Sequence, residues 1–198
     1  NIDQSLSYIS KNEMPIFLID SQNYVARTSI IKDSNNDEDQ IKEIIESLTK
    51  GTKKEGYIRD GFKSIIPENT KVYDLKLENN ILTINFSKEF LNIDEDNEEK
   101  MLESLIYSLT EIKTIKKIKI LVENKPLTEL PNSKKKLPEY LDKEYGINKI
   151  YNVTSLKDTT KTTTYYISKY NNYYYYVPVT KIDNDKLEKV NIIIKELK

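Results

Sequence analysis

The stretch that decides the fold is VYDLKLENNILTINF, residues 72–86. Its first half alternates apolar and charged residues, which predicts a β-strand with Tyr73, Leu75 and Leu77 on one face. Asn79 and Asn80 are expected to form the turn, because asparagine tolerates positive φ better than most residues. The second half returns with Leu82, Ile84 and Phe86 on its buried face, so a β-hairpin is predicted here.

The segments around this hairpin show the same two periodicities. Alternating or short apolar runs predict further strands at 15–20, 24–31 and 117–123. Two amphipathic helices are predicted, one over 38–48 with Gly51 as its cap and one that follows the acidic residues 94–99. Their apolar stripes are Ile41, Ile44, Ile45 and Leu48, and Leu102, Leu105, Ile106, Leu109 and Ile112. The order ββαββαβ predicts an α+β fold, a module of sheet and helix layers.

An internal repeat sets the domain organisation. Residues 16–49 align without a gap on residues 165–198, so that Asn23 and Tyr24 fall on Asn172 and Tyr173. The stripe of the first helix falls on Val190, Ile193, Ile194 and Leu197. A match at constant offset indicates a duplicated unit. We therefore predict a lead-in at 1–14, a complete domain at 15–127, a linker at 128–162, and the first half of a second domain at 163–198, with strands at 165–168 and 173–180 and a helix at 187–197.

Composition excludes several classes of function. The chain carries 31 basic and 32 acidic side chains, a balance that argues against a nucleic-acid partner. The mean hydropathy is −0.64, and the apolar runs fall short of the ~20 residues of a membrane-spanning helix. There is no cysteine and no histidine, which removes disulfides, thiolate ligands and the commonest general base. We predict no catalytic, cofactor-binding or metal-binding residues.

Tyrosines form the most conspicuous candidate site. Tyr173, Tyr174, Tyr175 and Tyr176 follow one another in a predicted strand, so alternate rings should point to opposite faces. One pair is expected to pack inward, and the other is a candidate interaction surface for a protein or for a cell-wall glycan. The alternatives are that the rest of the second unit covers the outer pair, or that the tyrosines only reflect the residue usage of an AT-rich genome.

Acidic residues give weaker candidates. The cluster Asp94, Glu95, Asp96, Glu98 and Glu99 lacks the spacing and the turn glycine of a calcium loop, so it is interpreted as a solvated helix N-terminus. Glu68, Glu89 and Glu111 have no substrate-binding context, and we do not expect them to be catalytic.

Three motifs within 66–118 resemble the GerM domain family of bacterial sporulation and spore germination lipoproteins. They are Ile66-Pro67-Glu68-Asn69-Thr70, Phe86-Ser87-Lys88-Glu89-Phe90, and Ser108-Leu109-Thr110-Glu111 followed by Lys116-Lys117-Ile118. The resemblance covers roughly 16–127 and, more weakly, 163–198. Asn69 and Asn124 stand where the family usually has glycine, and asparagine can adopt the same left-handed conformation.

This resemblance implies a tandem, ring-building-motif-like module in a non-enzymatic envelope protein. It implies a protein that acts in sporulation or germination outside the cytoplasmic membrane, either as a lipoprotein on its outer face or in the forespore intermembrane space. Any export signal or anchor is expected to lie outside this sequence, and contact with the membrane is expected only through that anchor. The implied partners are other copies or components of the sporulation channel, bound through a sheet edge or helix face. The alternative is a glycan-binding domain that uses the tyrosines, and no cofactor is implied by either.

Overall fold

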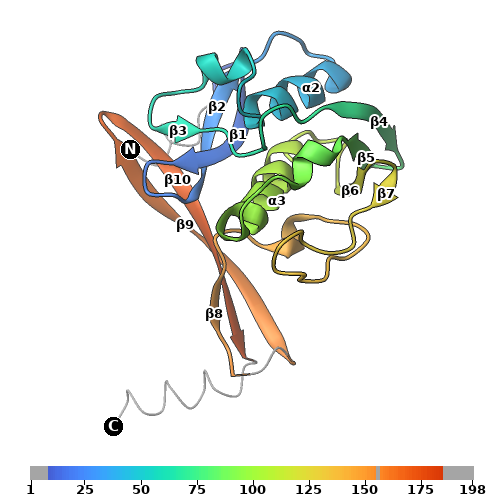
Figure 1. The fold of residues 1–198 in the computed structure, drawn as a ribbon. Coiled ribbons are helices and arrows are strands. Elements are labelled where there is room, and N and C mark those ends of the chain that lie inside the picture. Colours follow the sequence, from blue (N-terminus) through green and yellow to red (C-terminus); the bar gives the residue numbers. More distant parts are fainter. Residues whose placement is uncertain (1–8, 155–156, 185–198) are drawn as a thin grey trace.

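A computed structural model describes residues 9–154 and 157–184, and the helix predicted at 187–197 lies outside these residues. Two β-sheets enclose the helices, and a long hairpin extends from the body (Figure 1). The α+β class predicted from the sequence is confirmed. In the described part of the chain, no helix combines the length and the apolar character needed to cross a membrane.

The first sheet joins the two ends of the chain. Its strands are β1 (Glu13–Asp20), β2 (Val25–Ile31), β3 (Phe62–Lys63), β8 (Ile150–Asn152), β9 (Thr159–Tyr170) and β10 (Tyr173–Asn184). The strand order is β3-β1-β2-β10-β8, and β9 forms an additional antiparallel pair with β10. The second repeat therefore does not stand apart, because β10 continues the sheet of the first unit through the pair Tyr176–Arg27.

The second sheet contains the hairpin that opened the sequence analysis. Its strands, in spatial order, are β4 (Val72–Glu78), β5 (Ile81–Phe86), β6 (Lys117–Val122) and β7 (Lys125–Pro126). Asn79 and Asn80 have φ values of 52° and 63°, so the predicted turn is confirmed. The buried face of β4 was predicted wrongly: a register shift between Val72 and Asp74 leaves Tyr73 exposed on an outer strand. The Tyr73 hydroxyl instead donates a hydrogen bond to Glu123 Oε1 at 3.1 Å.

Both predicted helices are present, with side-chain caps at their N-termini. Helix α2 (Asp37–Leu48) begins after Asn36, whose side chain accepts hydrogen bonds from two backbone N–H groups, and α3 (Glu95–Leu109) begins after Asp94. Thr49 ends α2 in an extended conformation, so the prediction of Gly51 as its cap was wrong. Gly51 shapes the following turn, with φ at 77°. Three short 3₁₀ segments complete the elements: η1 (Lys54–Tyr57), η2 (Lys88–Leu91) and η3 (Lys143–Tyr145).

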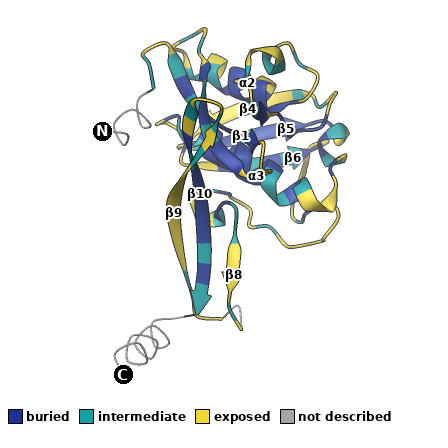
Figure 2. Cartoon of the chain, turned by 90° about the vertical axis from the view of Figure 1, so that its left-hand side faces the viewer, coloured by how far each residue is buried: buried dark blue, intermediate teal, exposed yellow. Residues whose placement is uncertain are grey.

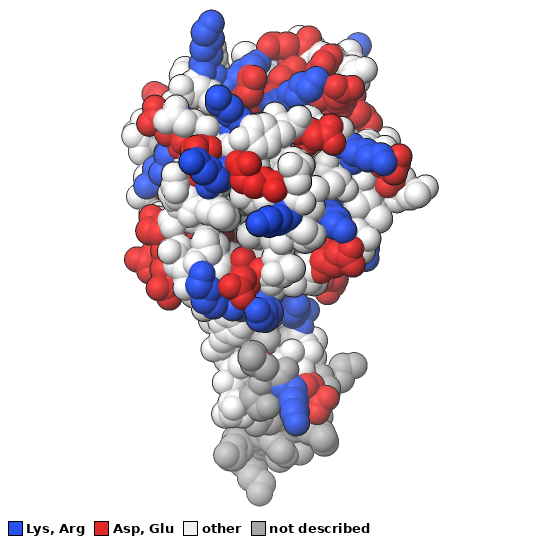
Figure 3. All heavy atoms as spheres, turned by 45° about the vertical axis from the view of Figure 1, so that its right-hand side comes forward, with Lys and Arg blue, Asp and Glu red and all other residues white. Residues whose placement is uncertain are grey.

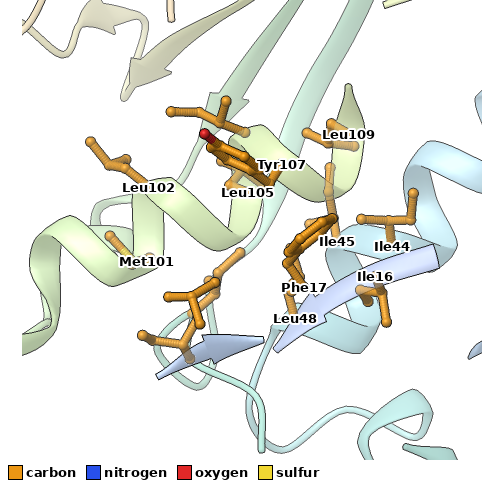
Figure 4. Packing of buried hydrophobic residues seen from close by; sticks show 14 of the residues in the cluster. Ile16, Phe17, Ile44, Ile45, Leu48, Met101, Leu102, Leu105, Tyr107 and Leu109 are labelled. Atoms are coloured by element: carbon orange, nitrogen blue, oxygen red, sulfur yellow. The ribbon is translucent and has the colours of Figure 1, made fainter. Parts of the chain in front are cut away.

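Helix α3 lies at the centre of the core, between the two sheets (Figure 1). Every residue from Met101 to Leu109 is buried, which a helix on one face of a single sheet does not achieve. Ser108 allows a close approach to β1, where its Oγ accepts a hydrogen bond from the Phe17 N–H at 2.9 Å. The Phe17 ring stands edge-on to Tyr107 and close to Ile45 of α2 (Figure 4).

The segment predicted as a linker, 128–162, packs against the body over much of its length. Leu130, Leu141 and Ile147 are buried, and Leu141 exchanges two backbone hydrogen bonds with Ile118 of β6. The short helix suggested near 139–145 is reduced to η3. The threonine tract at the end of this segment belongs to β9, because Thr and Tyr both favour strands and together make one continuous run.

The two copies of the repeated hairpin differ in strand register. In the first copy Ile19 lies opposite Val25, and the turn contains Asn23 at a φ of 68°. If the second hairpin kept the register of the first, the offset of the repeat would place Ser168 opposite Tyr174. Lys169 lies opposite Tyr174 instead, because a turn of only two residues, Asn171-Asn172, connects β9 and β10. A slip of one residue reverses the face to which each side chain of one strand points relative to its partner. The repeat is therefore conserved in its elements but not in its packing.

Gly61 fixes the second hairpin to the first unit. Its φ is 88°, and a Cβ built there would lie 2.4 Å from the ring of Tyr170 in β9. We expect Gly61→Ala to lower the free energy of unfolding by about 2 kcal/mol, since the left-handed backbone and the ring contact both oppose a side chain. Urea unfolding measures this loss. Gly56→Ala, where no atom lies within 4 Å, is the control, and equal stability of the two variants would contradict the docking of Tyr170.

Candidate functional site

The four candidate tyrosines alternate between the two faces of β10, as predicted. Tyr175 is only 2% exposed, and its hydroxyl donates a hydrogen bond to the buried Asp20 Oδ2 at 3.0 Å. Burial and this carboxylate raise the pKa of Tyr175. Tyr173 lies on the same face, stacked on Tyr175 and beneath the guanidinium of Arg59 at 4.0 Å. Tyr175 is therefore a core residue, and its inclusion in a surface was wrong.

The opposite face of the hairpin carries an aromatic surface that we name the tyrosine patch: Tyr165, Ile167, Tyr174 and Tyr176. Tyr176 lies opposite Ile167 in the ladder, and residues directly opposite share a face. Tyr174 is 44% exposed and Tyr165 is 54% exposed. The ring of Tyr165 stands edge-on to that of Tyr176, at 81° and a centroid distance of 6.1 Å. Whether this patch binds a partner stays a prediction.

Strand β9 forms the outer edge of the hairpin. In the described part of the chain it pairs only with β10, and residues 161–167 are all exposed (Figure 2). Tyr170 and Tyr173 flank a two-residue turn, so they form a hydrogen-bonded pair, and such pairs recur at every second position. Tyr165, opposite Pro178, lies between two such pairs and forms no backbone hydrogen bonds with the residue opposite it. Its N–H and C=O therefore point away from β10, toward the open edge.

The charge distribution separates the body from the hairpin. Lysine, arginine and acidic side chains are interspersed over the visible face of the body, whereas the extension below it is mostly uncharged (Figure 3). Among β8, β9 and β10 the charged residues are Lys161, Lys169, Lys181 and Asp183. A long edge strand with so few charges lacks the usual protection against pairing with another strand.

The acidic candidates behave as structural groups. Asp94 caps α3, and the carboxylate of Glu98 accepts hydrogen bonds from the backbone N–H groups of Asn132 and Ser133. Glu111 forms an ion pair with Lys143 at 3.0 Å, and Glu89 lies in the short segment η2. Among the residues that the structure describes, no three carboxylates are grouped so that they could hold a metal ion.

The edge of β9 was not predicted, because residues 159–162 were assigned to the linker and the strand was expected to begin only at Tyr165. The signal was present, since the threonines run without a break into Tyr165 and Tyr166, and β-branched and aromatic residues favour strands. That the outer edge of this strand is open depends on the sheet order and could not be inferred from the run itself.

Comparison with known proteins gives concordant results. The family described as Germane, sporulation and spore germination, matches residues 8–128. The spore germination protein GerM of Bacillus subtilis (strain 168) is 30% identical over an aligned region that covers 98% of this chain and 52% of that protein. The chain thus spans about half the length of this curated relative.

Two solved structures show the same fold. The tandem GerMN domains of the sporulation protein GerM from Bacillus subtilis match with a TM-score of 0.80 and 26% identity, over 92% of this chain and 64% of that one. The first GerMN domain alone matches with a TM-score of 0.62 and 23% identity, over 67% of this chain and 98% of that domain. The higher score with the tandem agrees with a second, partial copy of the unit.

Proposed function

This chain belongs to the Germane family, and from that membership we propose that it acts in sporulation or spore germination as a protein-binding assembly module. It works outside the cytoplasmic membrane, anchored at the outer face of that membrane or confined between the two forespore membranes. Its partners are further copies of itself or components of a sporulation channel. It binds these partners and does not catalyse a reaction.

The observation that carries this proposal is the open edge of β9. Every second residue of β9, Tyr165 among them, points its backbone N–H and C=O away from β10, beside an exposed aromatic patch. An incoming extended segment gains main-chain hydrogen bonds at such an edge, and the neighbouring side chains provide specificity. Lys161 and Lys169 are the only charged residues on β9, so a segment that carries carboxylates fits it best.

The geometry of the tyrosine patch argues against the glycan-binding alternative. A sugar ring stacks on a flat aromatic face, and a platform for an oligosaccharide needs neighbouring rings with similar orientation. Tyr165 and Tyr176 are nearly perpendicular, and the ammonium of Lys169 lies 5.1 Å from the ring centroid of Tyr174. Such a surface is better suited to a protein segment.

We expect Tyr165→Pro to abolish self-association, because proline removes the outward N–H of this position without touching the ladder to β10. Sedimentation velocity across a wide concentration range measures the effect. The wild-type sedimentation coefficient should rise with concentration, and the variant should remain a monomer.

Tyr165→Thr is the matched control, since it also removes the ring but retains the N–H and a β-branched side chain. It should associate like the wild type or within about threefold of it. Equal association of the proline and threonine variants would show that the edge of β9 is not the contact. A wild-type monomer at every concentration would exclude self-association and leave the channel components as partners.

A further inference from the structure

A cavity of about 670 Å³ opens between α3 and the hairpin, on the face of β10 opposite the tyrosine patch. One wall comprises Val177 and Val179 of β10 and Tyr166 of β9, which share this face of the hairpin. The other wall is the acidic side of α3, where Glu95, Glu99 and Glu103 recur every four residues and so project in the same direction. Asp96 and Lys100 stand beside them.

Of the described residues that line this cavity, the carboxylates without an ion-pair partner lie only at its exposed mouth. Four carboxylates line it, but only two ammonium groups, those of Lys100 and Lys149. Deeper in the cavity the charges are matched. Lys149 Nζ lies 3.4 Å from Glu99 and 3.8 Å from Glu103, and Glu99 also pairs with Lys135. Lys100 donates a hydrogen bond to the Asn23 carbonyl at the turn between β1 and β2. Glu95 and Asp96, which are exposed, have no cation among these groups to bind them.

We propose that this cavity binds a basic side chain, arginine or lysine, presented by a partner polypeptide. The aliphatic stem of such a side chain packs against Val177, Val179 and Tyr166, and its charged head reaches the α3 carboxylates. No other common side chain combines a long apolar stem with a positive head. The site deepens the proposed protein-binding function, but it uses the cavity wall and not the outward edge of β9.

The affinity of this site for a cation should depend on pH through Glu103. Burial raises the pKa of Glu103 to about 8, although Lys149 opposes the shift. The groups that face it are Glu99 and Lys100 on α3, Asn148 and Lys149 before β8, and the ring of Tyr145 in η3. A bound cation lowers the pKa of this carboxyl, so the free protein carries a proton that the complex releases. Binding therefore strengthens as the pH rises from 6 to about 9.

The test uses NMR titration of the 198-residue chain with acetyl-Leu-Arg-Leu-amide. Acetyl-Leu-citrulline-Leu-amide is the matched probe, because citrulline has nearly the same shape without the charge. We expect the arginine peptide to shift the amide signals of Lys149 and Tyr166, with a dissociation constant on the order of 1 mM. The citrulline peptide should leave them unchanged. Equal binding of the two peptides, or no shift with either, overturns the proposal.

Two sets of variants locate the site. Glu95→Gln with Asp96→Asn removes charge at the exposed mouth without disturbing the core, and should weaken the arginine peptide about tenfold. Asp74→Asn, exposed on β4 and outside the cavity, should change nothing. Glu103→Gln should remove the dependence of affinity on pH. An unchanged affinity in the double variant, or an unchanged pH dependence in Glu103→Gln, counts against the site.

The experiments can refute either proposal without refuting the other. Tyr165→Pro leaves the cavity lining intact, so peptide binding should persist when self-association is lost. A chain that associates through β9 but does not distinguish arginine from citrulline would refute the cavity alone.

Discussion

Lys149→Met is expected to lower the free energy of unfolding by about 3–5 kcal/mol at neutral pH, because it removes a buried cation that lies beside Glu103 and shares Glu99 with Lys135. The Lys149 side chain is 5% exposed and that of Glu103 is 2% exposed, so water cannot replace the lost charge. Its ammonium lies over the Tyr145 ring, 3.4 Å from the centroid, and methionine replaces it with an uncharged side chain of similar length that can fill the same space. Equilibrium urea unfolding gives the free energy.

The size of this loss should depend on pH. The Glu103 pKa of about 8 lies above its unfolded value near 4.5, so the folded state keeps a proton that the unfolded state loses. Stability from this group therefore falls as the pH rises from about 4.5 to about 8. Burial raises the pKa of Glu99, but Lys135 and Lys149 outweigh that effect and hold it below the usual value. Without Lys149 both pKa values rise, so the deficit should be smaller at pH 5 than at pH 8.

Two further variants make this result interpretable. Lys42→Met removes the cation of an exposed ion pair within α2 and should leave stability unchanged. Glu103→Gln mimics the protonated carboxyl, so adding it to Lys149→Met should recover part of the loss and flatten the pH profile. If Lys149→Met is no less stable than Lys42→Met, the buried charges do not support the fold.

Phe17→Ala should destabilise the chain by about 3–5 kcal/mol, the usual loss for a phenylalanine truncated in a packed core. Phe17 is buried on β1, where its ring meets Tyr107 of α3 edge-on at a centroid distance of 5.5 Å. Since β1 also carries β3 and β2 on its two sides, a cavity at this position loosens the sheet as well as the helix contact. Thermal and urea unfolding should both report the loss.

The control for this variant lies on the neighbouring strand. Ile31 is exposed at the end of β2, opposite Glu13, and Ile31→Thr keeps the β-branched shape. Its effect should stay within about 0.5 kcal/mol. A Phe17→Ala variant as stable as Ile31→Thr would mean that the interface between β1 and α3 contributes little to stability.

Local pattern was sufficient for the elements that are built from near neighbours in sequence. The Asn79-Asn80 turn, the buried faces of β5 and β6, and the helix stripes follow from periodicity and turn chemistry, and the structure confirms them, except that Ile112 is buried beyond the end of α3. The two asparagines that replace family glycines, Asn69 and Asn124, also adopt the expected positive φ, at 66° and 64°. Each of these features depends on interactions within a few residues.

Errors arose where a neighbouring strand or a turn decided the outcome. Alternation along β4 indicated an apolar face that includes Tyr73, but a bulge against β5 and the position of β4 at the sheet edge expose that ring. The repeat predicted two equivalent hairpins, but the shorter turn at Asn171-Asn172 shifts the register of the second one. Turn length decides register, and register decides which rings are buried.

The sequence by itself determined the α+β class, the order of the strands and helices, the duplicated unit and the family. The class and the order of elements follow from composition and local periodicity, the duplicated unit from a self-match at constant offset, and the family from the resemblance of its motifs. Only the tertiary structure decided that β10 extends the first sheet, that β9 is an open edge, and that Lys149 lies between Glu99 and Glu103. The reason is physical: pairing and burial depend on contacts between residues distant in sequence, and a lysine that will be buried looks, in the sequence, like any of the exposed ones.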